Sequence, residues 1–269
     1  MLSFQLKRGI KSKVTTERAN ALSFSKLSHS YLMNPDLPYK IFALGDSAIT
    51  VDFGNVIEEE INKRVIALFQ HFCQSPFQGM VEAVPTYSSL TIYYDVFALQ
   101  KKVDKQKTIY EWVKDNIEKK MLESIPDNEQ AARLIKIPVC YDPEFGMDIE
   151  ELAAQKNISI GDVILLHSEK KYRVFMLGFL PGFAYLGIID EKIAMPRKSH
   201  PRRKVDPGSV GIAGRQTGIY PLQTPGGWQI IGRTPMKIFD AQNEQPTLLQ
   251  AGDLVEFIPI SKKDFLDLQ

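Results

Sequence analysis

The chain has 269 residues, 44% of them hydrophobic and 24% charged, and a formal net charge of +1. This length can bury one large core or two ordinary ones. The near-neutral charge offers no field that would attract nucleic acid or a membrane surface, so we expect neither as a partner. Cys73 and Cys140 lie far apart without metal-binding or redox spacing, which favours reduced thiols in a cytoplasmic protein. No apolar run approaches the roughly 20 residues of a membrane-spanning helix.

Residues 1–33 differ in composition from the rest of the chain. They carry six Lys or Arg side chains against one acid, Glu17, and their apolar residues follow no helical or strand period. They show no apolar core of signal-peptide length, so we expect no secretion signal. Because a packed element is hard to build from such a segment, we predict that residues 1–38 are a disordered extension and that Met33 is an alternative start. A basic targeting arm is the competing interpretation.

Residues 39–140 predict an α+β sandwich domain. Apolar residues at helical spacing predict an amphipathic helix over 58–72, and a second helix is expected over 109–122. Strand-like runs occupy residues 41–44, 48–53, 80–84, 90–94 and 134–139. This order of elements indicates helices on one face of a small sheet, which the last strand would close.

The sequence of residues 141–269 predicts a β-barrel domain, in which two short helices precede the strands of the barrel. Asp148 with Glu151, and Ser159 with Asp162, have the spacing of capping pairs at helix N-termini. Beyond the second helix the pattern changes to short strands and tight corners, which is typical of a compact barrel.

Glycine and proline are concentrated in residues 178–235, which hold more than half of the 17 glycines and almost half of the 16 prolines. Glycine permits positive φ and close approach, whereas proline fixes φ and removes a donor, so the segment prescribes loop shapes. Two interpretations are open: the glycines only turn barrel corners, or the loops shape a binding site.

The strongest candidate site is a glycine-framed run of polar residues. Arg215, next to Gly214, has the guanidinium fork that clamps a carboxylate or phosphate, and Gln216 and Thr217 could orient such a ligand. Tyr220 adds an amphipathic ring. The alternative is that Gln216 and Thr217 satisfy buried barrel backbone.

His167 is a further catalytic candidate, because an imidazole can transfer protons near neutral pH. It ends the second predicted short helix, where a histidine is also favoured by the helix dipole and can bind free carbonyls. The capping role is the preferred interpretation.

A proline-stiffened basic run is a candidate surface for binding substrate or partner. Its basic side chains are Arg197, Lys198, His200, Arg202, Arg203 and Lys204. Guanidinium groups bind carboxylates in a bidentate manner, and proline lowers the entropy cost of binding. A solvated loop without function is the alternative.

An aromatic loop precedes the basic run. Its residues are Gly178, Phe179, Pro181, Gly182 and Phe183. Core packing explains alternating aromatics, whereas an exposed turn of this kind would suit a partner chain. Trp228 is expected in the core.

The absence of common catalytic motifs favours a site that another chain completes. The sequence has no GxxxxGK[ST] phosphate loop, no GxGxxG, no HExxH and no GxSxG nucleophile turn. A self-contained hydrolase or dehydrogenase of a common type is therefore not expected, and we predict no metal site.

Long motifs in the chain resemble the family that contains KipI and the B subunits of 5-oxoprolinase, also called allophanate hydrolase subunit 1. The motifs are LGFLPGFAYLG (177–187), GSVGIAGRQTGIYPLQTPGGWQIIGRTP (208–235), LLQAGDLVEFIPI (248–260) and LGDSAITVDFGNVIEEEINKRV (44–65). The resemblance covers roughly residues 39–260.

The resemblance implies a cyclophilin-like barrel and a carboxyltransferase-type assembly, similar to that of urea carboxylase. It implies that the chain is the B subunit of a bacterial 5-oxoprolinase, which opens pyroglutamate to glutamate at the expense of ATP with its partners, the A and C subunits. The alternative is a KipI-like inhibitor that binds a sensor histidine kinase. A prolyl isomerase would rest on fold analogy alone.

Overall fold

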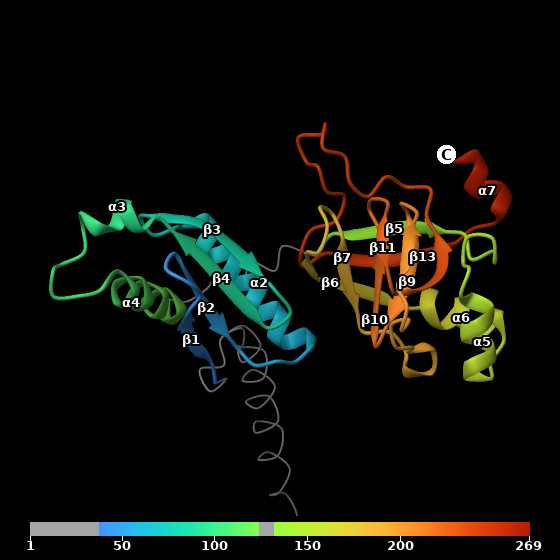
Figure 1. The fold of residues 1–269 in the computed structure, drawn as a ribbon, viewed down its shortest axis with the longest axis horizontal. Helices are drawn as coiled ribbons and strands as arrows, with labels where there is room; N and C mark the ends of the chain where they lie inside the picture. Colours follow the sequence, from blue (N-terminus) through green and yellow to red (C-terminus); the bar gives the residue numbers. More distant parts are fainter. Residues whose placement is uncertain (1–37, 124–131) are drawn as a thin grey trace, which may run out of the picture.

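The computed structural model describes residues 38–123 and 132–269. The predicted extension falls outside the described residues, Pro38 excepted. Two parts lie side by side: a small sheet with its helices, coloured blue to green, and a larger sheet, coloured yellow-green to red (Figure 1).

The amino-terminal part is a four-stranded antiparallel sheet covered by helices. Its strands, in spatial order, are β1 (Lys40–Ala43), β2 (Ala48–Asp52), β4 (Ser89–Tyr94) and β3 (Met80–Pro85). Its helices are α2 (Glu59–Gln74), α3 (Val96–Gln100) and α4 (Ile109–Leu122). Alternate residues of β2 and β4 form one buried cluster with α2 and α4, which confirms the predicted periodicities.

The prediction that residues 134–139 close this first sheet is wrong. They form β5 (Leu134–Val139), which pairs in parallel with β13 (Leu254–Pro259) in a different, seven-stranded sheet. Ile137 and Val139 point into the core of that second sheet. An apolar run identifies a strand but does not identify the partner of that strand.

The seven-stranded mixed sheet curls into a nearly closed barrel, as predicted. Its order is β12-β9-β10-β7-β6-β13-β5, and two hydrogen bonds of 2.9 Å between Cys140 and Arg233 join its first and last strands. The strands not yet given are β6 (Lys171–Leu177), β7 (Ala184–Gly187), β9 (Ser209–Ala213), β10 (Gln216–Ile219) and β12 (Gln229–Arg233). The remaining elements are α5 (Ile149–Lys156), α6 (Ile160–Ser168), η1 (Glu191–Ile193), α7 (Lys262–Asp267) and a ribbon of β8 (Arg202–Val205) with β11 (Thr224–Gly226).

One predicted helix cap is present and the other is absent. Ser159 and Asp162 form a reciprocal capping box at the start of α6. Asp148 makes no side-chain cap on α5, so its predicted pairing with Glu151 is wrong. The Asp148 carboxylate instead binds groups far away in the sequence.

A buried amide fastens the two parts to each other. Asn62 of α2 is fully buried, and its Nδ2 donates to the carbonyls of Thr86 (3.1 Å), Tyr87 (3.2 Å) and Phe175 (3.0 Å). Its Oδ1 accepts from Arg173 Nε at 3.0 Å. Helix α2 and the loop between β3 and β4 are thereby held against β6 of the barrel.

Candidate functional site

His167 is a core residue and neither a cap nor an accessible catalytic group. Its ring is fully buried and stacks on the ring of Phe257, with centroids 4.5 Å apart. Nδ1 lies 2.8 Å from Tyr141 Oη, and Nε2 lies 2.9 Å from Thr217 Oγ1. Burial lowers the pKa of His167 to about 3, so the ring is neutral at physiological pH.

The hydrogen bonds of Thr217 fix the tautomer of this ring. Thr217 Oγ1 donates its proton to the carbonyl of Gly211 at 3.1 Å, so it accepts the bond from His167. Nε2 therefore carries the ring proton, and Nδ1 accepts from the hydroxyl of Tyr141. Thr217 is fully buried, and its bond to the Gly211 carbonyl is the backbone-satisfying role that the sequence offers as the alternative for this residue.

Tyr220 also belongs to the core, contrary to its predicted place in an accessible site. It is 1% exposed, and its ring packs against Phe183 with centroids 5.2 Å apart. Burial raises the pKa of its phenol, although the backbone amide of Trp228 donates to it. Gly226 makes room for this ring, because a Cβ there would lie 2.5 Å from Tyr220 Oη.

Gly214 and Arg215 form the tight turn between β9 and β10. Ala213 pairs with Gln216 across this turn, and Gly214 has a φ of 60°, as such a turn requires. The Arg215 side chain is exposed and makes no ion pair with any described residue. Its role as an anion clamp stays a prediction.

Gln216 connects the barrel to the amino-terminal part. Its Nε2 donates to Tyr87 Oη at 2.9 Å. Tyr87 lies in the loop between β3 and β4, and its ring also contacts Phe175 and Tyr185. Burial raises the pKa of Tyr87 to about 12, so its phenol stays protonated.

The aromatic loop is divided between core and surface. Phe183 is 1% exposed and packs against Tyr220 and Trp228, which corrects its assignment as a partner-binding residue. Gly178 and Gly182 shape the turn, and Gly182 has a φ of 81°. Phe179 is 66% exposed and Pro181 is exposed, so a partner could reach both.

The basic run contains cations with and without an acidic partner. Arg202 binds the buried carboxylate of Asp148, so its charge is used within the chain. Lys198 pairs with Asp148 at 2.9 Å and with Glu151 at 3.1 Å. Arg197 and Arg203 are exposed and have no carboxylate partner among the described residues.

Arg197 forms one end of a chain of contacting side chains that we call the aromatic–arginine surface. Arg197 is exposed, Tyr87, Tyr185 and Gln216 are half-buried, and Trp228, which the Arg197 guanidinium covers, is buried. Arg197 Cζ lies 5.9 Å above the ring of Trp228. The ring centroid of Tyr185 lies 5.9 Å from that of Trp228 and 5.9 Å from that of Tyr87. The hydroxyl of Tyr87 accepts a hydrogen bond from Gln216. Burial raises the pKa of Tyr185, and the nearby charge of Arg197 opposes this rise. A guanidinium beside flat rings suits a planar ligand that carries a carboxylate.

Sequence reasoning missed Tyr87 and understated Asp148. Tyr87 follows a strand without any motif, so only its position in space links it to Arg197. The spacing of Asp148 and Glu151 indicates a local cap, and nothing in it points to the distant groups that Asp148 binds. Trp228 is 5% exposed, as expected for a core residue.

Membrane-spanning helices and metal-binding clusters are both absent from the part of the chain that the structure describes. No helix there is long and apolar enough to cross a membrane. No group of three or more His, Cys, Asp or Glu side chains there could hold a metal ion.

The fold is that of a carboxyltransferase-type protein. Residues 39–249 match the family profile of the carboxyltransferase domain, subdomain C and D, and the chain belongs to this family. Among curated relatives, the B subunit of 5-oxoprolinase from Bacillus subtilis (strain 168) is 46% identical over 228 residues, which cover 84% of this chain and 95% of the relative. The B subunit of 5-oxoprolinase from Escherichia coli O157:H7 is 36% identical and covers 82% of this chain and 95% of its own length.

Solved structures agree on the fold. The crystal structure of TTHA0988 superposes with a TM-score of 0.68 at 34% identity, over 80% of this chain and 40% of that longer chain. The Kluyveromyces lactis urea carboxylase superposes with a TM-score of 0.64 at 20% identity, over 85% of this chain and 22% of its own, which supports the fold alone.

Proposed function

We propose that this chain is the B subunit of an ATP-dependent 5-oxoprolinase, which opens pyroglutamate to glutamate together with the A and C subunits. The observation that carries the proposal is the 46% identity to a curated B subunit of 5-oxoprolinase, of which the match spans 95%. A match over nearly the whole relative favours a shared role over a shared fold.

The accessible chemistry of the chain supports a role within a complex. His167, Thr217 and Tyr220 are enclosed in the core, whereas the described surface offers arginines without an acidic partner there, a glutamine and aromatic rings. These groups can bind and orient an anionic substrate, but ring opening also needs a proton donor or a nucleophile. We propose that a partner chain supplies that group next to the aromatic–arginine surface, in a cytoplasmic complex.

ATP is assigned to the complex and not to residues of this chain. Neither the sequence motifs nor the described loops offer a glycine-rich phosphate cradle at a helix N-terminus. Arg197 and Arg215 lie on separate segments, so we assign neither to a nucleotide.

The test is to purify this chain alone and with the A and C subunits, and to measure glutamate and ADP formed from 5-oxoproline and ATP. We expect turnover only from the complete set. Turnover by the single chain would contradict the proposal that a partner chain supplies the missing catalytic group. No turnover by the complete set, together with inhibition of a sensor histidine kinase by the chain, would favour the kinase-inhibitor alternative.

A further inference from the structure

The backbone on both sides of Arg197 is fixed by one short segment, residues 227–229, which leads into β12. The carbonyl of Pro196 accepts from Gln229 Nε2 at 2.9 Å, and the amide of Lys198 donates to the carbonyl of Gly227 at 2.7 Å. Residues 196 and 198 are thus held by residues 229 and 227. Arg197 therefore faces Trp228, the residue between those two.

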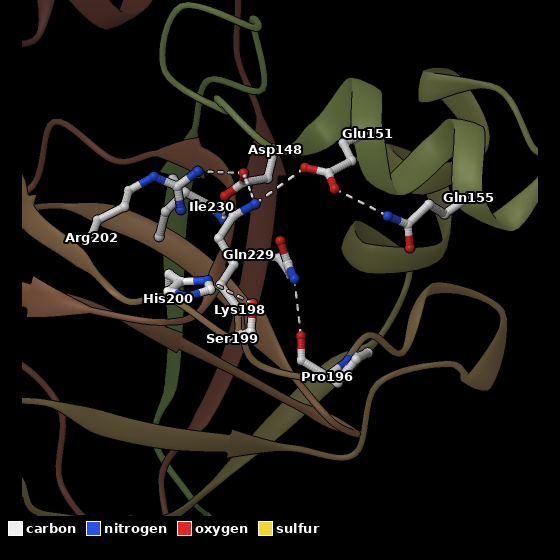
Figure 2. Close-up of polar contacts among 10 residues, drawn as sticks. All are labelled: Asp148, Glu151, Gln155, Pro196, Lys198, Ser199, His200, Arg202, Gln229 and Ile230. Carbon is white, nitrogen blue, oxygen red and sulfur yellow. Dashed lines mark hydrogen bonds and ion pairs between the residues drawn. The ribbon is translucent and has the colours of Figure 1, made fainter.

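The buried carboxylate of Asp148 holds the same segment through its side chains. Asp148 is 2% exposed, and its carboxylate accepts from Lys198 Nζ and from Arg202 Nη2 (Figure 2). It also accepts from the amide of Ile230 at 2.6 Å, and its own amide donates to the Ile230 carbonyl at 2.8 Å. Asp148 therefore anchors the loop that carries Arg197 to the barrel strand that follows Trp228.

This cluster is not fully satisfied by the residues the structure describes. Arg202 Nη1 and Gln229 Oε1 are buried and have no hydrogen-bond partner among them. Buried polar atoms left unpaired are uncommon and are enriched where structure serves function. The Arg197 guanidinium itself is exposed, with one face toward an aromatic ring and its N–H groups available for a ligand.

We propose that Arg197 binds the carboxylate of a small planar ligand that lies on the aromatic–arginine surface, and that Asp148 is the residue that positions Arg197 for this contact. An arginine held against a ring loses little side-chain freedom on binding, so more of the interaction appears as affinity. This inference rests on the proposed function and deepens it, because 5-oxoproline is a small ring with a planar lactam group and one carboxylate.

The first test uses the assembled complex. We compare 5-oxoproline with its carboxamide in the wild type, in Arg197→Gln, and in Lys192→Gln, which removes an exposed cation elsewhere on the barrel. Loss of a charge-assisted hydrogen bond predicts that Arg197→Gln raises the KM for 5-oxoproline about 10-fold or more and leaves the KM for the carboxamide unchanged. Lys192→Gln should match the wild type.

An unchanged preference for the carboxylate in Arg197→Gln would overturn the inference. If that variant also fails to co-purify with the partner chains, Arg197 is an interface residue instead.

The second test reads binding on the chain alone and so remains valid if the proposed function fails. Tryptophan emission is titrated with millimolar 5-oxoproline and, separately, with its carboxamide. We expect a saturable change with the carboxylate only, lost in Arg197→Gln and in Trp228→Phe and retained in Lys192→Gln. Absence of the change in the wild type, or its persistence in Arg197→Gln, would refute the assignment.

The positioning role of Asp148 has its own readout. Asp148→Asn keeps the shape of the side chain but leaves Lys198 and Arg202 without their carboxylate. At a temperature well below the melting midpoint of the variant, we expect the carboxylate-to-carboxamide preference to fall several-fold with kcat nearly unchanged. A lower melting midpoint with an unchanged preference for the carboxylate over the carboxamide would show that Asp148 has a structural role only.

Discussion

The neutral, buried His167 should make the protein lose stability as the pH falls below neutrality. The pKa of His167 is about 3 in the folded protein and 6.5 in the ordinary exposed state. The unfolded chain therefore binds a proton between pH 6.5 and pH 3 that the folded chain does not bind. Stability is complete above this window and decreases throughout it as the pH falls. From about pH 7 to about pH 5 the loss from this residue is about 2 kcal/mol.

The assay is urea unfolding at about pH 7 and about pH 5 for the wild type and for His167→Gln, which cannot titrate. His167→Gln will be less stable at both values because its packing changes, so the informative quantity is the difference between the two pH values. We expect that difference to be about 2 kcal/mol smaller in the variant. Contributions of carboxylates cancel, because both proteins contain them.

His200→Gln is the matched control, since it removes an exposed histidine of the same barrel. It should keep the pH dependence of the wild type. An equal loss on acidification in the wild type and in His167→Gln would refute the reasoning, because it would mean that His167 titrates alike in the folded and unfolded states.

Three further predictions concern separate features. Arg215→Lys keeps the charge but loses the guanidinium fork, so we expect activity of the complex to fall about 10-fold with an unchanged melting temperature; unchanged activity would make Arg215 an ordinary surface residue. Asn62→Leu leaves three carbonyls without their donor and should cost about 3 kcal/mol in urea unfolding, whereas a loss below about 1 kcal/mol would show that the two parts do not depend on this amide. A chain that begins at Met33 should fold and bind its partner chains like the full chain, and a stability loss above about 1 kcal/mol would show that residues 1–32 pack on the body.

Local patterns predicted the elements well. The buried face of α2 follows from apolar spacing, and the capping box of Ser159 and Asp162 follows from two residues three positions apart. These features depend on neighbours in the chain, which a single sequence displays directly.

Partners distant in sequence were not predictable in the same way. Nothing local indicates that β5 pairs with β13, or that Asp148 meets Arg202 rather than capping its own helix. His167 has a plausible local role at a helix end, but its ring enters a core built from other strands. Sequence reasoning therefore grouped candidate residues that the structure separates: Thr217 and Tyr220 are buried in the core, whereas Arg215 is exposed on a turn.

The parallel pairing of β5 with β13 has a consequence for synthesis of the chain on the ribosome. β5 emerges about 120 residues before the strand that pairs with it, a delay of roughly 6–24 s at ordinary elongation rates. The small sheet and its helices are complete by residue 122, so they can fold during that delay. The apolar edge of β5 meanwhile has no partner, which makes it a target for chaperones or for aggregation. Release of correctly folded protein should therefore depend on residues 254–259, and a chain cut short of them should leave a folded amino-terminal part joined to an unfinished barrel.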